Sequence, residues 1–92
     1  MDKIEKLKLM DKILRELEDL QSSQTAVLKK VSQIEAHNIS LGLQSLQDKL
    51  PNLHEQIDSS VVIVSDLVEA FSTERDTFFI QNKMGAILDP TL

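Results

Sequence analysis

Two ladders of mostly apolar residues meet at Gly42, and this arrangement constrains the fold of the 92-residue sequence more than any other feature. In each ladder the positions recur at alternating steps of three and four residues, the pattern of a helix stripe that packs against another helix. The first ladder comprises Met10, Ile13, Leu17, Leu20, Gln24, Val27, Val31, Ile34, Asn38 and Leu41. The second comprises Leu43, Leu46, Leu50, Leu53, Ile57, Ser60, Val64, Leu67, Phe71, Glu74 and Phe78.

The two ladders are out of phase at Gly42. The step from Leu41 to Leu43 is roughly 200° around a helix at about 100° per residue, so one continuous helix would place the two stripes on nearly opposite faces. A turn at Gly42 folds the stripes onto each other instead, and glycine tolerates the left-handed conformation that follows many helix ends. Asn38 and Ser40 nearby are also compatible with a turn. The sequence therefore predicts an all-α fold, an elongated antiparallel helical hairpin of the coiled-coil type.

Reflection of the sequence about Gly42 predicts the register of the hairpin. It pairs Val27 with Ile57, and it places the polar residues Gln24 and Ser60 opposite each other. A side-chain hydrogen bond between these two would satisfy the polar groups of both. A buried polar pair of this kind lowers the stability but fixes the register of the two helices. We expect Gln24, Ser60 and Gly42 to define the hairpin register.

The whole sequence is expected to form one helical domain, residues 1–92. The first arm covers about 3–39, the turn 40–42, the second arm 43–83, and a short tail 85–92. The tail is apolar enough to dock on a partner or to fold back onto the helices.

Two positions within the arms favour a break. Residues 21–25 are all polar, and Ser23 is able to cap a new helix there. The seven-residue repeat from Ile13 through Leu41 continues across this run, which favours an unbroken first arm. In the second arm Pro51 lacks a backbone donor, so a kink or a restarted helix is expected there.

Apolar residues remain uncovered when the predicted ladders are paired, and they form columns beside them. A helix that is apolar nearly all round is usually buried in a bundle, so these columns predict an interface. We expect a homo-oligomer, most simply a dimer of hairpins that makes a four-helix bundle, or else a protein partner. The predicted interface residues are Leu7, Leu14, Leu28, Val61, Ile63 and Val68.

The charge pattern argues against nucleic-acid and membrane partners. The net charge is −5, and residues 43–92 carry three basic residues, Lys49, Arg75 and Lys83, against eight acidic ones. Nucleic acid and anionic membranes both require clustered positive charge. The sequence has no cysteine, its first residues lack the apolar core of a signal peptide, and no apolar run approaches the roughly 20 residues that span a bilayer. A cytoplasmic location is therefore the default expectation.

One segment resembles a catalytic motif. The run from His54 to Asp58 is similar to the His-Glu-x-x-His pattern of zinc proteases, with aspartate in the last position. A third ligand and a substrate cleft are missing, and a solvated helix face explains the run better. The sequence contains neither a nucleophile–base arrangement nor a glycine-rich phosphate loop, so we expect no enzymatic activity, cofactor or metal.

These observations favour a non-enzymatic structural or protein-interaction module that assembles through its helix faces. The alternative is a small acidic inhibitor, adaptor or chaperone that binds and blocks a larger protein. Secretion chaperones and small viral or phage proteins are similar in general architecture. An enzyme that uses the His54 segment is the third hypothesis.

Overall fold

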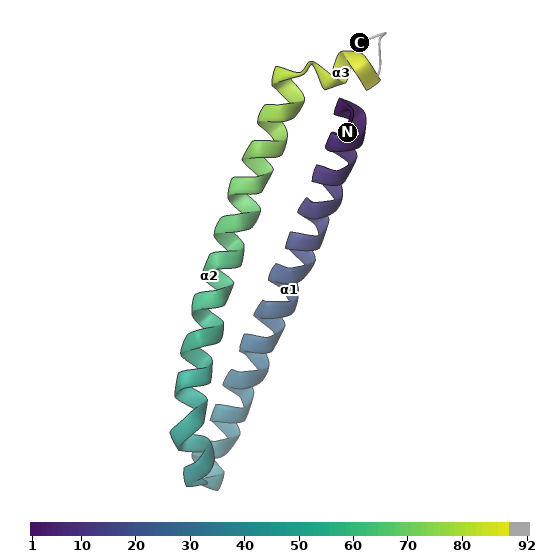
Figure 1. The fold of residues 1–92 in the computed structure, drawn as a ribbon. Coiled ribbons are helices and arrows are strands. Elements are labelled where there is room, and N and C mark those ends of the chain that lie inside the picture. The colour runs from purple at the N-terminus through teal and green to yellow at the C-terminus, as the bar shows by residue number, and fades with distance from the viewer. Residues whose placement is uncertain (89–92) are drawn as a thin grey trace.

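The computed structural model describes residues 1–88, which form two long helices and one short one (Figure 1). α1 spans Lys3–Leu41 and α2 spans Gln44–Gln81, and the two lie side by side in opposite directions. α3 spans Met84–Leu88 and lies at the open end of the hairpin, near the N-terminus. The molecule measures 65 × 20 × 17 Å, with a Cα radius of gyration of 20.1 Å. The predicted all-α, elongated antiparallel hairpin is confirmed.

α1 is a single helix with a capped start. The Asp2 carboxylate accepts a hydrogen bond of 2.8 Å from the Glu5 backbone N–H, which satisfies one of the free donors at the helix N-terminus. The helix then runs without a break through the polar residues 21–25. The seven-residue repeat therefore predicted the continuity of this arm correctly.

The turn consists of Gly42 and Leu43 and is held together by Asn38. Gly42 adopts the left-handed conformation, with φ 69° and ψ 31°, and its N–H donates to the Asn38 carbonyl oxygen at 2.7 Å. The Asn38 side chain brackets Leu43, since its Oδ1 accepts from the Leu43 N–H at 2.9 Å and its Nδ2 donates to the Leu43 carbonyl at 3.1 Å. The turn is shorter than the predicted 40–42 because α1 continues to Leu41.

The second arm differs from the prediction at both ends. α2 does not restart at Pro51 but runs continuously through it, and the adjacent Leu50 is buried against α1. Packing of this kind offsets the helical hydrogen bond that proline cannot make. At the other end the chain after Lys83 is the helix α3 rather than an irregular tail from 85 onward. Predicted tail positions 89–92 lie outside the described residues.

The columns that face the other helix differ from those predicted. One column of each ladder does turn inward, and it includes Val31 and Val64, each 5% exposed. The second inward column of α1 contains Leu7, Leu14, Gln21, Leu28 and Glu35, where the sequence analysis placed Ile13, Leu20, Val27, Ile34 and Leu41. The second inward column of α2 contains His54, Val61, Val68 and Arg75, where it placed Leu53, Ser60, Leu67 and Glu74.

The expectation that Leu7, Leu14, Leu28, Val61 and Val68 lie uncovered is therefore wrong. Leu7 is 4% exposed, and the other four are partly buried. Ile63 is 60% exposed, as expected. The reason is that a three-four ladder has an apolar column on each side of its central column, and helix periodicity does not say which side turns inward.

Candidate interaction surface

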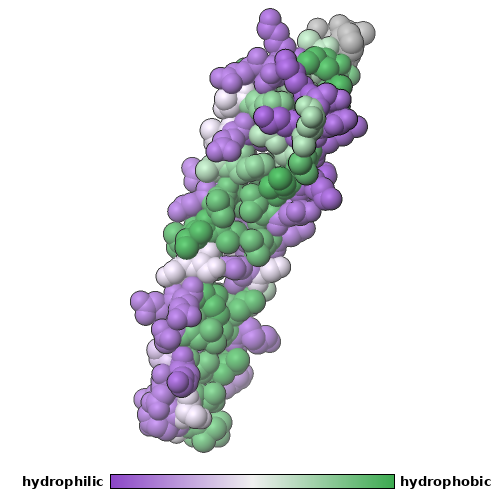
Figure 2. Space-filling model, in the orientation of Figure 1, coloured by the Kyte–Doolittle hydropathy of each residue, from purple (hydrophilic) through white to green (hydrophobic). Residues whose placement is uncertain are grey.

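The hairpin exposes rows of aliphatic side chains on one side, which we call the apolar face. Figure 2 shows it as a green band that runs along both helices. Most of its residues are exposed in spite of their apolar character; Val27, for example, is 49% exposed. The apolar face consists of Ile13, Leu20, Val27, Ile34, Leu41, Leu53, Ile63 and Leu67.

A polar layer interrupts the apolar face near its middle. The Ser60 hydroxyl donates a hydrogen bond of 2.6 Å to Gln24 Oε1, and a small hollow of about 80 Å³ between Val27 and Ile57 lies beside it. Figure 2 shows a paler band that crosses the green one. The structure thus places Gln24 opposite Ser60, in the register that reflection about Gly42 indicates.

The opposite side of the hairpin, which we call the bridged face, carries polar contacts between the helices instead. Gln21 Nε2 donates to Ser65 Oγ at 3.0 Å. Glu35 Oε1 and His54 Nδ1 lie 2.5 Å apart, and Arg75 Nε donates to Asp11 Oδ1 at 2.7 Å. These three contacts are spread along the hairpin from its turn to its open end. They join α1 to α2 on this side by directional bonds.

Arg75 also links the bridged face to the C-terminal helix. Its Nη1 donates to Asp76 Oδ1 at 3.2 Å, and its guanidinium carbon lies 4.9 Å from the centre of the Phe79 ring. The same ring lies beside Gly85 in α3. The hydrogen bond to Asp11 is the main cause that raises the pKa of Arg75 above its ordinary value. The guanidinium therefore stays charged at neutral pH.

The sequence analysis did not identify the residues of the bridged face as contacts. A signal was present, because Asp11 and Arg75, and likewise Gln21 and Ser65, are placed almost symmetrically about Gly42. Polar side chains at reflected positions are able to bond across a hairpin. Such pairs on the flanks of the ladders are the signal in the sequence for the bridged face.

The first residue of the zinc-protease-like segment, His54, has a structural role in the hairpin. His54 makes the contact with Glu35 across the hairpin, where their side chains are 39% and 32% exposed. Within residues 1–88, no three His, Cys, Asp or Glu side chains gather closely enough to hold a metal ion. The arrangement around His54 is that of an interhelix hydrogen bond.

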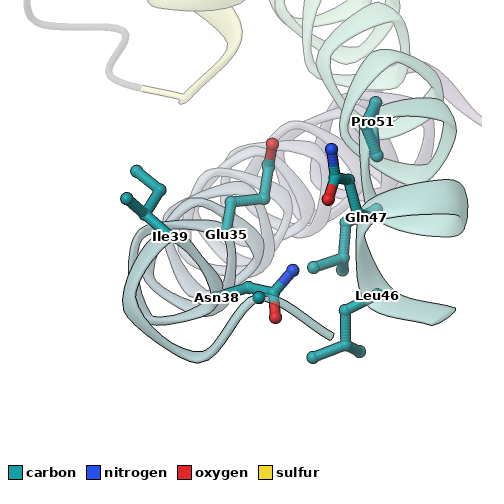
Figure 3. Close-up of a pocket in the computed structure, with 8 residues that line it drawn as sticks. Glu35, Asn38, Ile39, Leu46, Gln47 and Pro51 are labelled. Carbon is teal, nitrogen blue, oxygen red and sulfur yellow. The ribbon is translucent and has the colours of Figure 1, made fainter. Parts of the chain in front are cut away.

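A shallow hollow of about 350 Å³ lies at the turn (Figure 3). Glu35, Asn38 and Ile39 of α1 line it on one side, and Leu46, Gln47 and Pro51 of α2 line it on the other. Two of its polar side chains are already engaged, Glu35 with His54 and Asn38 with Leu43. The apolar face is therefore the stronger candidate for a functional surface.

Comparisons with protein-family models, with characterised proteins and with solved structures find no match for this chain. No helix within residues 1–88 combines the length and the apolar character needed to cross a membrane.

Proposed function

We propose that this protein is a non-enzymatic interaction module that pairs with a second copy of itself through the apolar face. In this pairing two hairpins form a four-helix bundle, with the apolar faces in the centre and the bridged faces outside. The observation that carries the proposal is the row of exposed aliphatic side chains at helical spacing on one side of the hairpin.

The dimensions of the face support a stable pairing. The hairpin is 65 Å long and about 20 Å wide, so one side presents on the order of 1,000 Å², more than the roughly 800 Å² per partner of a standard interface. Exposed apolar patches larger than a few hundred Å² mark interaction sites in most proteins. Burial of this face would add a second apolar layer to a molecule whose own core is thin.

The composition of the face favours a second copy as the occupant. Its side chains are Leu, Ile and Val, the residues that interlock between helices in bundles, and it contains no aromatic residue. A two-helix layer is already half of a four-helix bundle, and the same surface on both subunits suits a two-fold interface. The small acidic inhibitor or adaptor is the competing function, in which the same face binds a larger protein.

The test compares two valine substitutions in a concentration series measured by light scattering and sedimentation. Val27 lies in the apolar face, whereas Val62 is 56% exposed and lies about 200° around α2 from the buried Val64. We expect a dimer for the unaltered protein, a monomer of unchanged helix content for Val27→Asp, and a dimer for Val62→Asp. A well-folded monomer at every concentration of the unaltered protein would contradict self-pairing and support the adaptor.

A further inference from the structure

We propose that the two copies pair antiparallel, with the two-fold axis passing through the Gln24–Ser60 layer. This inference rests on the proposed self-pairing and adds its geometry. Face-to-face pairing allows two symmetric arrangements. In the parallel one, both turns lie at the same end and α1 packs on α2 of the partner; in the antiparallel one, the turns lie at opposite ends and each helix packs on its own copy.

The aliphatic residues of the apolar face are arranged symmetrically about the polar layer. On α1, Leu20 and Val27 lie three to four residues on either side of Gln24, and Ile13 and Ile34 lie about ten residues on either side. On α2, Leu53 and Leu67 each lie seven residues from Ser60. The Gln24–Ser60 hydrogen bond puts the two centres at the same height.

Antiparallel pairing uses this symmetry on both helices at once. Leu20 meets Val27 of the partner subunit, and Leu53 meets Leu67 of the partner subunit. Ser60 meets Ser60 of the partner subunit, so the polar layer is matched with itself. In the parallel arrangement Ser60 lies at the height of Gln24 of the partner subunit, so the polar layers meet there as well. The polar layer therefore fits both arrangements, and the charges at the edge of the face distinguish them.

Charges at the edge of the face favour the antiparallel arrangement. Glu16 and Lys30 are exposed and occupy the next column outward on α1, each seven residues from Ser23. Antiparallel pairing brings Glu16 next to Lys30 of the partner subunit, and the two-fold axis repeats this ion pair. In the parallel arrangement the edge of α1 runs beside the α2 column of Lys49, Gln56, Ile63 and Ala70, which offers Lys30 no acidic partner. Its basic residue, Lys49, lies near the turn and far from Glu16.

A distance between the two turns distinguishes the arrangements. The chain has no cysteine, so a single Ser40→Cys substitution, at an exposed position near the turn, gives one spin label per subunit. Since Ser40 lies sixteen residues from Gln24, antiparallel pairing puts the labels about 50 Å apart at about 1.5 Å per residue. Parallel pairing puts them about 20 Å apart, across a bundle whose neighbouring helices are 8–10 Å apart.

The expected result of pulsed electron paramagnetic resonance is the long distance. A short distance in a confirmed dimer would overturn the antiparallel arrangement and leave the self-pairing intact. A monomeric protein would overturn the proposed function as well, so the two failures are distinguishable.

Charge exchange tests the Glu16–Lys30 contact independently. Glu16→Lys and Lys30→Glu should each weaken the dimer about threefold to tenfold, and the double variant should return to within about twofold of the unaltered protein. Within one chain the two residues are about 21 Å apart along α1, beyond the screening length at physiological salt, so recovery reports a contact between subunits.

The matched control is Glu18→Lys, which makes the same charge change two residues away, toward the bridged face. We expect its dimer dissociation constant to stay within about twofold of the unaltered value. A double variant weaker than either single variant would overturn the proposed antiparallel contact.

Discussion

The two faces of this hairpin differ in composition: polar bonds between the helices predominate on the bridged face, and exposed aliphatic side chains predominate on the apolar face. On the bridged face, polar groups of α1 and α2 bond to each other in three places. On the apolar face one such bond, between Gln24 and Ser60, lies within a row of exposed aliphatic residues. The bridged face is complete within one chain, whereas the apolar face leaves surface that another layer would bury. The difference separates what holds the hairpin together from what remains available for assembly.

The thin core of the single hairpin gives this difference an energetic meaning. The buried apolar side chains within residues 1–88 are Leu7, Val31, Leu50, Val64 and Met84. A small domain has little buried surface to offset the entropy of ordering its chain. Burial of apolar surface contributes about 25 cal/mol per Å², and after the entropy cost of association is subtracted, covering the apolar face would add a net several kcal/mol. We therefore expect the assembled bundle to be much more stable than the isolated hairpin.

The largest expected effect separates the hairpin core from the apolar face. Val31 is 5% exposed and Val27, one helical turn earlier, is 49% exposed. Val31→Asp would bury an unpaired carboxylate and should lower the free energy of unfolding by at least about 3 kcal/mol, which unfolds the hairpin at every protein concentration. Val27→Asp should reduce the concentration-dependent part of the stability only. Circular dichroism melts over a concentration series measure both effects.

Equal losses of helix content in the two variants would show that the apolar face is needed for the hairpin itself. The comparison of the two faces would then be wrong, because α1 and α2 would not hold together through the bridged face and the core alone.

A smaller effect is expected at the end of the bridged face, where Arg75 of α2 bonds to Asp11 of α1 and stacks on Phe79, which lies beside Gly85 of α3. Arg75→Ala removes the bonds to Asp11 and Asp76 and the stacking on Phe79, so it should lower the stability by about 1–2 kcal/mol and expose α3. Arg75→Lys keeps the charge but loses the planar fork, and should restore part of that loss. Hydrogen exchange of the α3 amides, followed by mass spectrometry, measures the opening.

The sign of the pH dependence at Arg75 follows from its pKa. Because folding raises this pKa, the stabilisation is fully present below the ordinary arginine value and is lost only as the pH rises through the raised value. Deprotonation of Arg75 should therefore not open α3 near neutral pH. If the α3 amides exchanged faster in the unaltered protein than in Arg75→Ala, Arg75 would not be holding α3 in place.

The smallest expected effect compares two glutamines that each bond to a serine across the hairpin. Gln21 lies on the bridged face and bonds to Ser65, whereas Gln24 lies in the layer that the proposed dimer covers. Gln24→Ala leaves Ser60 without its partner in a buried layer, so it should cost about 1 kcal/mol more than Gln21→Ala in the dimer. The difference in cost should disappear when each of the two substitutions is made separately in the Val27→Asp background. Persistence of the difference in that monomeric background would contradict burial of the Gln24 layer by assembly.

The sequence by itself determined the two long helices and their register. Alternating spacing requires long helices, and the phase change at Gly42 requires a turn, because local backbone geometry decides both. The Gln24–Ser60 pair followed from reflection about that turn. By contrast, the sequence predicts a kink or a restarted helix at Pro51, whereas α2 continues through this residue. The packing of Leu50 against a distant helix is invisible to a local rule.

Only the tertiary structure decided which apolar column turns inward. The column with Leu7, Leu14 and Leu28 and the column with Leu20, Val27 and Ile34 both satisfy helix periodicity, since the two flank the same central column. The choice depends on contacts between residues far apart in sequence, such as Asp11 with Arg75 and Glu35 with His54. Those bonds form with the first column inside, which leaves the second exposed as the apolar face. Periodicity is a property of one helix, whereas the side that a helix buries is a property of the pair.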